Sequence, residues 1–385
     1  MTDILAIDAL FSDEEKLVRD TVRRFVAGRI LPEIGEWFER GHFDRGLVKG
    51  LAQLGLLGMH LRGYGCAGAS AVSYGVACME LEAGDTGVRS FVSVQGSLVM
   101  FPIHAFGSEE QRSLWLPALA SGDRIGCFGL TEPDFGSNPS GMRTRARRDG
   151  SDWIIDGSKM WITNGGIADV GIIWAQSDEG VRGFIVPSDS PGWTARDIHK
   201  KLSLRASVTS EIVLDSCRVP CTALLPGARG VRAALACLNE ARFGIIWGVL
   251  GAARACYECA VEYAKTRVAF DRPIGAFQLT QRKLVAMMLE LDKALLLAMQ
   301  IGRNKDAGRC SPEQISFGKL NNVRAALDIA REARTILAAN GVTLEYPVIR
   351  HMNNLESVLT YEGTEEIHTL VLGEAITGIA AYRTG

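Results

Sequence analysis

Hydrophobic and polar residues are spaced in three different ways along the chain. In the first part, apolar residues recur every three or four positions, which predicts amphipathic helices. The first of these helices follows Ser12-Asp13-Glu14-Glu15, which has the form of a capping box. Further helices are predicted over residues 47–57, 71–82 and 108–119. Residues 1–125 are therefore expected to form an α-helical domain.

The spacing changes after this first part. Short apolar runs end in turn residues, as at 153–157, and the runs 170–175 and 182–186 flank a polar turn as the strands of a hairpin do. Another short strand is predicted at 212–214. Strands of this length and spacing predict a small antiparallel sheet or barrel, and hence a β-domain, over residues 126–225.

Helical spacing returns after Pro226, over residues 231–265, 279–306 and 311–340. Long helices joined by short links favour antiparallel packing, so residues 226–385 are expected to form a four-helix bundle. The chain as a whole is thus predicted to be mainly α with a central β-region, in three domains.

Composition argues against several classes of protein. The 385 residues are 47% hydrophobic and 22% charged, as in ordinary soluble globular proteins. The net charge of −2 provides no basic excess for binding nucleic acid or an anionic membrane. No apolar run approaches the length of a membrane span, and the start of the chain lacks the basic and apolar regions of a signal peptide. We therefore expect a cytoplasmic bacterial protein with no nucleic-acid partner and no membrane insertion.

The spacing of cysteine and histidine argues against a metal site. The nine cysteines include one Cys-x-x-Cys pair, Cys256 and Cys259, which has no second ligand pair. Burial in a helix is the better explanation for that pair. The six histidines also lie outside any metal-ligand spacing, so no metal is expected.

Candidate chemistry begins at Thr360-Tyr361-Glu362-Gly363-Thr364, which precedes a helix-like run. Thr364 can cap that helix, which leaves free backbone N–H groups at its positive end. A carboxylate in the irregular segment before a helix can be aimed into a pocket as a general base, and Glu362 is the candidate. An isolated segment of this kind is more often a solvated turn, so the interpretation depends on other motifs.

Three such motifs occur elsewhere in the chain. Residues 127–137 read CFGLTEPDFGS, residues 159–164 read KMWITN, and the third run is Arg267-x-x-Phe270-x-x-Pro273-x-x-x-Phe277-Gln278. Together with the Glu362 segment, in this order and spacing, they resemble the acyl-CoA dehydrogenase family of flavoenzymes, from about Phe11 to Tyr382. Within that family the chain is most similar to the glutaryl-CoA dehydrogenases, through residues 63–68, Arg89-Ser90, Ser93-Val94-Gln95, 203–207 and Arg350-His351.

The resemblance implies the family's three domains, a homotetramer and a reaction. An α-proton would pass from an acyl-CoA thioester to Glu362, and a β-hydride would pass to FAD. The Glu362 backbone N–H and the flavin ribityl chain would bind the enolate oxygen. The residues implied to bind FAD are Phe128, Leu130, Thr131, Gly136, Ser137, Trp161, Ile162, Thr163, Arg267, Phe270, Gln278, Ala338, Ala339, Thr364 and Tyr382.

Two groups among these residues differ from the rest. Arg267, Phe270 and Gln278 are implied to reach the FAD of a neighbouring subunit, although a solvated arginine is the alternative for Arg267. Ala338 and Ala339 stand where the family usually has paired glycines. A slightly shifted contact to the FAD adenosine is expected there.

The resemblance also implies how the substrate is bound. Ser137, Arg242 and Gly363 would contact the CoA thioester, and the alternative for Arg242 is a buried ion-pair partner. Arg89 and Ser90 would meet a distal carboxylate, for which a guanidinium is suited because it forks two hydrogen bonds onto a carboxylate and keeps its charge. Glu82 and Tyr361 are the other residues implied to bind the substrate, since they match polar residues of the decarboxylating members of the family.

The implied function is that of an FAD-dependent glutaryl-CoA dehydrogenase of lysine and tryptophan degradation. It would oxidise glutaryl-CoA, decarboxylate the product to crotonyl-CoA and CO2, and pass electrons to an electron-transfer flavoprotein. One alternative is an enzyme acting on another acidic acyl thioester, on CoA or on a carrier protein, without decarboxylation. The other is a flavin-free scaffold that retains only the fold.

Overall fold

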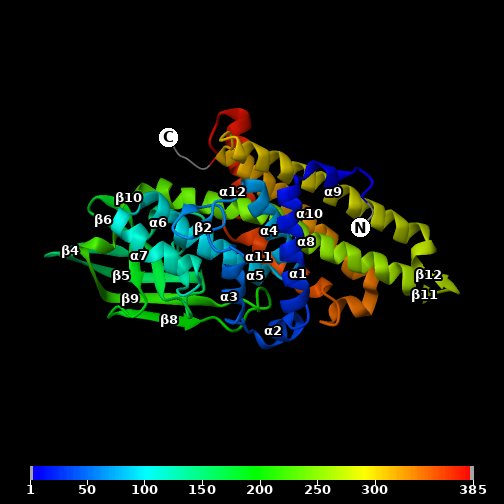
Figure 1. The fold of residues 1–385 in the computed structure, drawn as a ribbon, viewed down its shortest axis with the longest axis horizontal. Coiled ribbons are helices and arrows are strands. Elements are labelled where there is room, and N and C mark those ends of the chain that lie inside the picture. The colour runs from blue at the N-terminus through cyan, green and yellow to red at the C-terminus, as the bar shows by residue number, and fades with distance from the viewer. Residues whose placement is uncertain (1–2, 382–385) are drawn as a thin grey trace.

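The computed structural model describes residues 3–381, which form helices, then a β-sheet, then longer helices (Figure 1). At the start of α1, the Ser12 hydroxyl accepts the Glu15 N–H (3.3 Å) and the Glu15 carboxylate accepts the Ser12 N–H (2.9 Å), so the capping box is confirmed. The helix expected over 47–57 is shorter, because Gly55 adopts a left-handed φ of 69°. The elements of this region are α1 (Asp13–Arg29), α2 (Ile34–Arg40), α3 (Leu47–Gln53), β1 (Arg62–Gly63), β2 (Cys66–Ala67), α4 (Ala71–Gly84), α5 (Thr86–Ser93), α6 (Phe101–Phe106) and α7 (Glu109–Ala120).

Within the described residues, eight strands form the middle sheet, in the order β10-β7-β6-β4-β5-β9-β8, with β3 paired to β6. The β6–β7 hairpin is confirmed, with Ser177 opposite Gly180 at its turn. Strand β9 continues to Pro220, well beyond the short run expected there. The strands are β3 (Gly126–Gly129), β4 (Arg145–Asp149), β5 (Asp152–Thr163), β6 (Val170–Ser177), β7 (Gly180–Pro187), β8 (Trp193–Asp197), β9 (Thr209–Pro220) and β10 (Leu224–Arg229).

The expectation of an antiparallel sheet needs correction, because the sheet is mixed. Strand β3 pairs with β6 in parallel along its whole length, and β4 meets β6 in parallel where Arg145 lies opposite Gln176. A tight hairpin forces two strands to be antiparallel, but β3 enters the sheet from α7 and has no hairpin partner before it. The strand pattern alone therefore did not determine its direction.

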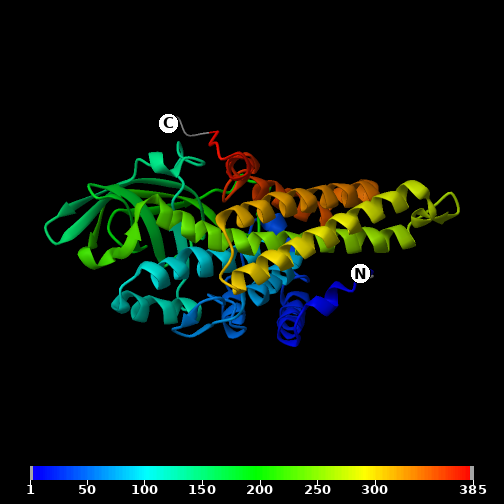
Figure 2. The ribbon, with the colours of Figure 1, turned by 90° about the horizontal axis from the view of Figure 1, so that it is seen from above.

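The C-terminal helices form the expected bundle. Helix α8 packs along both α4 and α10, and Figure 2 shows α8, α9 and α10 running beside one another. By length and composition α8 could cross a membrane, contrary to the expectation from the sequence, but 67% of its most apolar window is buried in the protein. The elements are α8 (Gly230–Thr266), β11 (Val268–Ala269), β12 (Arg272–Pro273), α9 (Gln278–Asp306), α10 (Pro312–Leu337), α11 (Val348–Thr360) and α12 (Glu365–Thr377).

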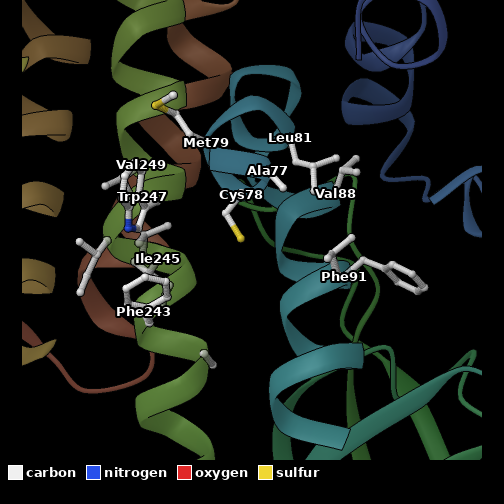
Figure 3. Packing of buried hydrophobic residues seen from close by; sticks show 14 of the residues in the cluster. Ala77, Cys78, Met79, Leu81, Val88, Phe91, Phe243, Ile245, Trp247 and Val249 are labelled. Carbon is white, nitrogen blue, oxygen red and sulfur yellow. The ribbon is translucent and has the colours of Figure 1, made fainter. Parts of the chain in front are cut away.

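The contact between α4 and α8 fixes the position of the helices that carry candidate site residues. Figure 3 shows Met79 and Cys78 of α4 on the side that faces α8, the helix that carries Phe243 and Trp247. Two glycines allow the close approach: a Cβ at Gly75 would lie 2.5 Å from the Trp247 ring, and one at Gly251 would overlap the Met79 carbonyl oxygen. Since interiors pack tightly, the end of α4 and the start of α5 are held firmly against α8.

Candidate active site

The Glu362 segment is a sharp turn between two helices. Helix α11 ends at Thr360, and Thr364 caps α12 by accepting the Ile367 N–H on its hydroxyl (3.3 Å). Glu362 and Gly363 both have left-handed backbones, with φ of 53° and 96°. For glutamate this conformation is uncommon and costs free energy, and such strain is concentrated at functional sites. The structure therefore places Glu362 where the sequence predicted an aimed carboxylate.

Two cations from neighbouring helices bind the carbonyl groups of this turn. The Lys319 ammonium donates to the carbonyl oxygens of Tyr361 (2.7 Å) and Gly363 (2.6 Å). The Arg242 Nε donates to the Glu362 carbonyl oxygen (2.7 Å), and its Nη1 donates to Asn239 (3.0 Å). Arg242, expected to contact the CoA thioester or to be a buried ion-pair partner, thus binds a neutral carbonyl group of the turn. Lys319 was not anticipated from the sequence.

One oxygen atom of the Glu362 carboxylate lacks a hydrogen-bond partner within the described residues. This atom, Oε2, is buried. Burial raises the pKa of the Glu362 carboxyl above its usual range, and the charges of Arg89, Arg242 and Lys319 oppose this rise. A buried acceptor that lacks a partner is costly, so the arrangement fits a ligand that supplies a proton to this atom.

Arg89 lies in a buried cluster next to this turn. Its Nε donates to Glu82 Oε2 (2.6 Å) and its Nη2 donates to the Tyr361 hydroxyl (2.6 Å). Ser90 Oγ lies 3.5 Å from the same hydroxyl. Burial alone would lower the pKa of Arg89, but the Glu82 carboxylate holds it well above its usual value. The structure thus brings together all four residues that the sequence assigned to the distal end of the acyl chain.

The space for the Arg89–Glu82 pair comes from Gly248 on α8. A Cβ at Gly248 would lie 3.0 Å from Arg89 Nε and would overlap the Glu82 carboxylate. This glycine was not identified from the sequence, because nothing in the apolar run around it indicates a charged pair on the next helix. Arg89 uses Nε and Nη2 within the described residues, which leaves Nη1 as a donor for a ligand.

The two motifs of the middle domain are joined by a buried ion pair. Lys159 of β5 donates to Glu132 Oε1 (2.8 Å) and to the Leu130 carbonyl oxygen (3.2 Å). Glu132 Oε2 accepts the Arg143 N–H (2.6 Å), and the Met160 N–H bonds the Thr131 carbonyl oxygen (2.9 Å). The loop after β3 is therefore fixed against β5, by charged residues to which the sequence analysis had given no role.

Of the apolar side chains expected to bind FAD in the middle domain, Trp161 is the one that presents a large surface. It is 61% exposed and sits at an irregularity of β5 with a left-handed φ of 63°. Phe128, Leu130 and Ile162 are 7%, 5% and 3% exposed, so they mainly pack into the core. An indole held outward in a strained conformation, near the polar Thr131 loop, fits a planar aromatic ligand such as a flavin.

The smaller residues expected at the flavin and CoA sites are accessible. Thr131 and Thr163 are half-buried, and Gly136 and Ser137 are exposed. A Cβ built at Gly136 would meet nothing within 4 Å, so the protein's own contacts do not require a glycine there. At Gly363 they do, because a Cβ would lie 2.8 Å from His368 Nε2.

A second group of predicted FAD residues lies apart from Glu362. Arg267, Phe270 and Gln278 are exposed at the tip formed by α8, β11, β12 and α9, which Figure 2 shows at the opposite end of the molecule from the sheet. Ala338 and Ala339 are exposed at the end of α10. One chain therefore does not unite these residues with the Trp161 site, and Tyr382 lies outside the described residues.

Comparison with known proteins decides the family. The family models of the acyl-CoA dehydrogenase N-terminal, middle and C-terminal domains match residues 12–123, 127–217 and 228–377. This chain belongs to the acyl-CoA dehydrogenase family. The predicted resemblance and the three-part fold are thereby confirmed, as is the prediction of an oxidoreductase.

Relatives within the acyl-CoA dehydrogenase family carry different substrate names. The short-chain specific enzyme of Homo sapiens mitochondria is 34% identical over 380 residues, which cover 97% of this chain and 92% of that protein. A Mycobacterium smegmatis glutaryl-CoA dehydrogenase, solved in complex with FADH2, is 62% identical with a TM-score of 0.98, and 99% of each chain is covered. A butyryl-CoA dehydrogenase from Megasphaera elsdenii is 32% identical with a TM-score of 0.91, covering 95% and 98%.

Proposed function

We propose that this acyl-CoA dehydrogenase oxidises glutaryl-CoA, decarboxylates the bound product to crotonyl-CoA and CO2, and passes its electrons to an electron-transfer flavoprotein. Its cofactor is FAD. The observation that carries the proposal is the position of Arg89, buried beside the Glu362 turn and bonded to both Glu82 and Tyr361. The similarity to solved glutaryl-CoA dehydrogenases, at 62% and 64% identity, supports it.

Glu362 is the base of the proposed reaction. Its carboxylate takes the α-proton of the thioester, and its unpartnered Oε2 is the atom free to do so. The backbone N–H groups of the turn stabilise the charge that develops on the thioester oxygen. FAD, when bound, would supply the acceptor for the β-hydride. The residues proposed to hold it are Trp161 and the polar residues of the Thr131 loop and β5.

Arg89 and Ser90 bind the distal carboxylate of the acyl chain. The remaining guanidinium donor of Arg89 is the contact, and Tyr361 and Glu82 hold the guanidinium in place. A purely apolar acyl chain would leave the Nη1 donor of the buried Arg89 without a partner, which is costly. The same cation orients the carboxylate that leaves as CO2.

A specific observation keeps the alternative acidic thioester open. Glu82 already neutralises Arg89, so the pair attracts an anion less strongly than a free arginine would. The enzyme would then dehydrogenate another acidic acyl chain, on CoA or on a carrier protein, without decarboxylation.

FAD is proposed to be shared between subunits of a homotetramer in the bacterial cytoplasm. Arg267, Phe270 and Gln278 are exposed at the tip of the bundle, far from the Trp161 site of the same chain. Phe270 is 89% exposed with a left-handed φ of 50°, which is unusual for a large apolar residue unless another molecule covers it. A neighbouring subunit provides that cover in the proposal.

The decisive experiment is anaerobic mixing of the purified flavoprotein with glutaryl-CoA, butyryl-CoA and a glutaryl carrier protein. Bleaching of the flavin identifies the thioester that is oxidised, and CO2 measured after turnover with electron-transfer flavoprotein reports decarboxylation. Bleaching by glutaryl-CoA without CO2 would refute decarboxylation alone. A purified protein without flavin absorbance would refute the enzyme function and favour the flavin-free scaffold.

A further inference from the structure

We propose that Lys319 is the positioning residue of the base: its charged ammonium fixes the direction of the Glu362 peptide and keeps the Glu362 carboxylate ionised. This inference rests on the proposed role of Glu362. Lys319 lies on α10, 2% exposed, and belongs to none of the motifs that the sequence analysis identified.

The geometry of the turn gives Lys319 control over one backbone group in particular. The Tyr361 carbonyl and the Glu362 N–H belong to the same peptide unit, and in a trans peptide these two groups point in opposite directions. Since the Tyr361 carbonyl points at Lys319 Nζ (2.7 Å), the Glu362 N–H points away from α10. That N–H is the donor proposed to bind the enolate oxygen, so the lysine aims it without touching the substrate.

The second contact of Lys319 closes the turn on the other side of the base. Its Nζ also bonds the Gly363 carbonyl (2.6 Å), while Arg242 bonds the Glu362 carbonyl between them (2.7 Å). Three successive carbonyls are thus bound by two cations, the buried Lys319 of α10 and the half-buried Arg242 of α8. These bonds hold Glu362 in the left-handed conformation that it would not adopt readily by itself.

The ammonium has no carboxylate in ion-pair contact within the described residues, because both of its bonds go to neutral carbonyls. Burial of such a charge is costly and lowers the pKa of Lys319 below its usual range. The charge that stabilises it is Glu362, whereas Arg242 and Arg89 repel it. Two neutral titratable groups lie nearby. Burial lowers the pKa of His368 of α12 to about 3, and it raises the pKa of Tyr361, whose ring centre lies 5.9 Å from Lys319 Nζ, to about 12.

Removal of the Lys319 charge should change the pKa of Glu362 in one direction. Without Lys319, the Glu362 carboxylate loses a stabilising cation, so the pKa of its carboxyl rises further above the usual range. Because the base must be ionised to accept a proton, the pH at which flavin reduction becomes fast moves upward. A residue with a purely structural role would lower stability but would not move this profile.

The test uses Lys319→Met, which keeps the length and removes charge and donors, and Lys319→Gln, which keeps a donor. Lys319→Arg is the charge-conserving rescue. Asn322→Leu is the matched control, since Asn322 lies on the same helix, is buried, and donates to two carbonyls, of Ile246 (2.9 Å) and Ala294 (3.2 Å), away from the base. Stopped-flow flavin reduction by acyl-CoA is measured against pH, with FAD content and urea unfolding.

We expect Lys319→Met and Lys319→Gln to keep FAD and to shift the pH profile upward by about one unit or more, with roughly tenfold slower reduction at neutral pH. Lys319→Arg and Asn322→Leu should keep the wild-type profile. An unchanged profile in the Met and Gln variants overturns the inference. Failure of both to fold with FAD, while Asn322→Leu does, also overturns it, because Lys319 would then serve the fold. If the wild type is reduced by no acyl-CoA, or equally fast with Glu362→Gln, the proposed function itself has failed.

Discussion

Replacing Arg89 by glutamine tests the substrate proposal, and the structure shows that the replacement does two things at once. It removes the donor for the distal carboxylate, and it strands Glu82, which is fully buried and bonded to Arg89 at 2.6 Å. Breaking a buried ion pair by removing one partner costs about 3–5 kcal/mol, so Arg89→Gln should lower the free energy of unfolding by about that amount. Activity measured on this variant alone would therefore mix a loss of stability with a loss of substrate binding.

The double variant Glu82→Gln/Arg89→Gln separates the two effects. It replaces the ion pair by two neutral amides, so most of the lost stability should return while the carboxylate contact stays absent. We expect kcat/KM for glutaryl-CoA to remain depressed by about a hundredfold or more in both variants, which is about 2.7 kcal/mol of transition-state stabilisation. Butyryl-CoA never uses this contact, so its kcat/KM should change little in the double variant.

The assay is steady-state kinetics with both thioesters, alongside urea unfolding followed by circular dichroism. Equal losses for glutaryl-CoA and butyryl-CoA in the double variant would mean that Arg89 is structural. Recovery of glutaryl-CoA activity in the double variant would mean that the guanidinium does not bind the substrate. Either result would reduce the substrate proposal to an acyl-CoA of undetermined chain.

Three further predictions follow from the same geometry. Glu362→Gln should keep FAD and substrate binding but nearly stop flavin reduction. In the wild type, flavin reduction should slow as the pH falls through the raised pKa of Glu362, because protonation removes the base. Stopped-flow rates of flavin reduction, measured against pH for the wild type and the variant, test both expectations. Arg267→Ala should weaken FAD retention in ultrafiltration, since a phosphate contact from a neighbouring subunit is lost; an active monomer that holds FAD tightly would contradict this. Ala338→Gly should raise the free energy of unfolding by about 1 kcal/mol, because the backbone of Ala338, with φ 51° and ψ −125°, is in a region that favours glycine. An unchanged or lower melting temperature of the variant would show that alanine is not strained at this position.

Local features of the fold were predictable from the sequence because their causes are local. The capping box at Ser12, the hairpin of β6 and β7 and the long helices of the bundle all follow from residues adjacent in the chain. The parallel pairing of β3 with β6 was missed because it depends on where α7 delivers the chain. The strands alone contain no information on that direction.

The same distinction holds at the site. Arg89, Tyr361 and Glu362 were found because each lies in a motif that stands out along the chain, and the structure brings them together. The contacts of Lys319 were missed because they join residues more than forty positions apart through the packing of α10 against the end of α11. A buried lysine in a helix has the same local appearance as a solvated one, since helical spacing alone does not reveal what covers each face.

The lack of a side chain at Gly248 makes the residue at position 248 depend on the residue at position 89, although the two are far apart in the sequence. A methyl group at position 248 would overlap the Glu82–Arg89 ion pair. An arginine at position 89 that is paired with Glu82 is therefore compatible only with glycine at position 248. The acyl specificity of this scaffold can therefore be altered from α8, by a substitution that never contacts the acyl chain. In related sequences, the two positions should vary together, and a larger residue at 248 should accompany an uncharged pocket end.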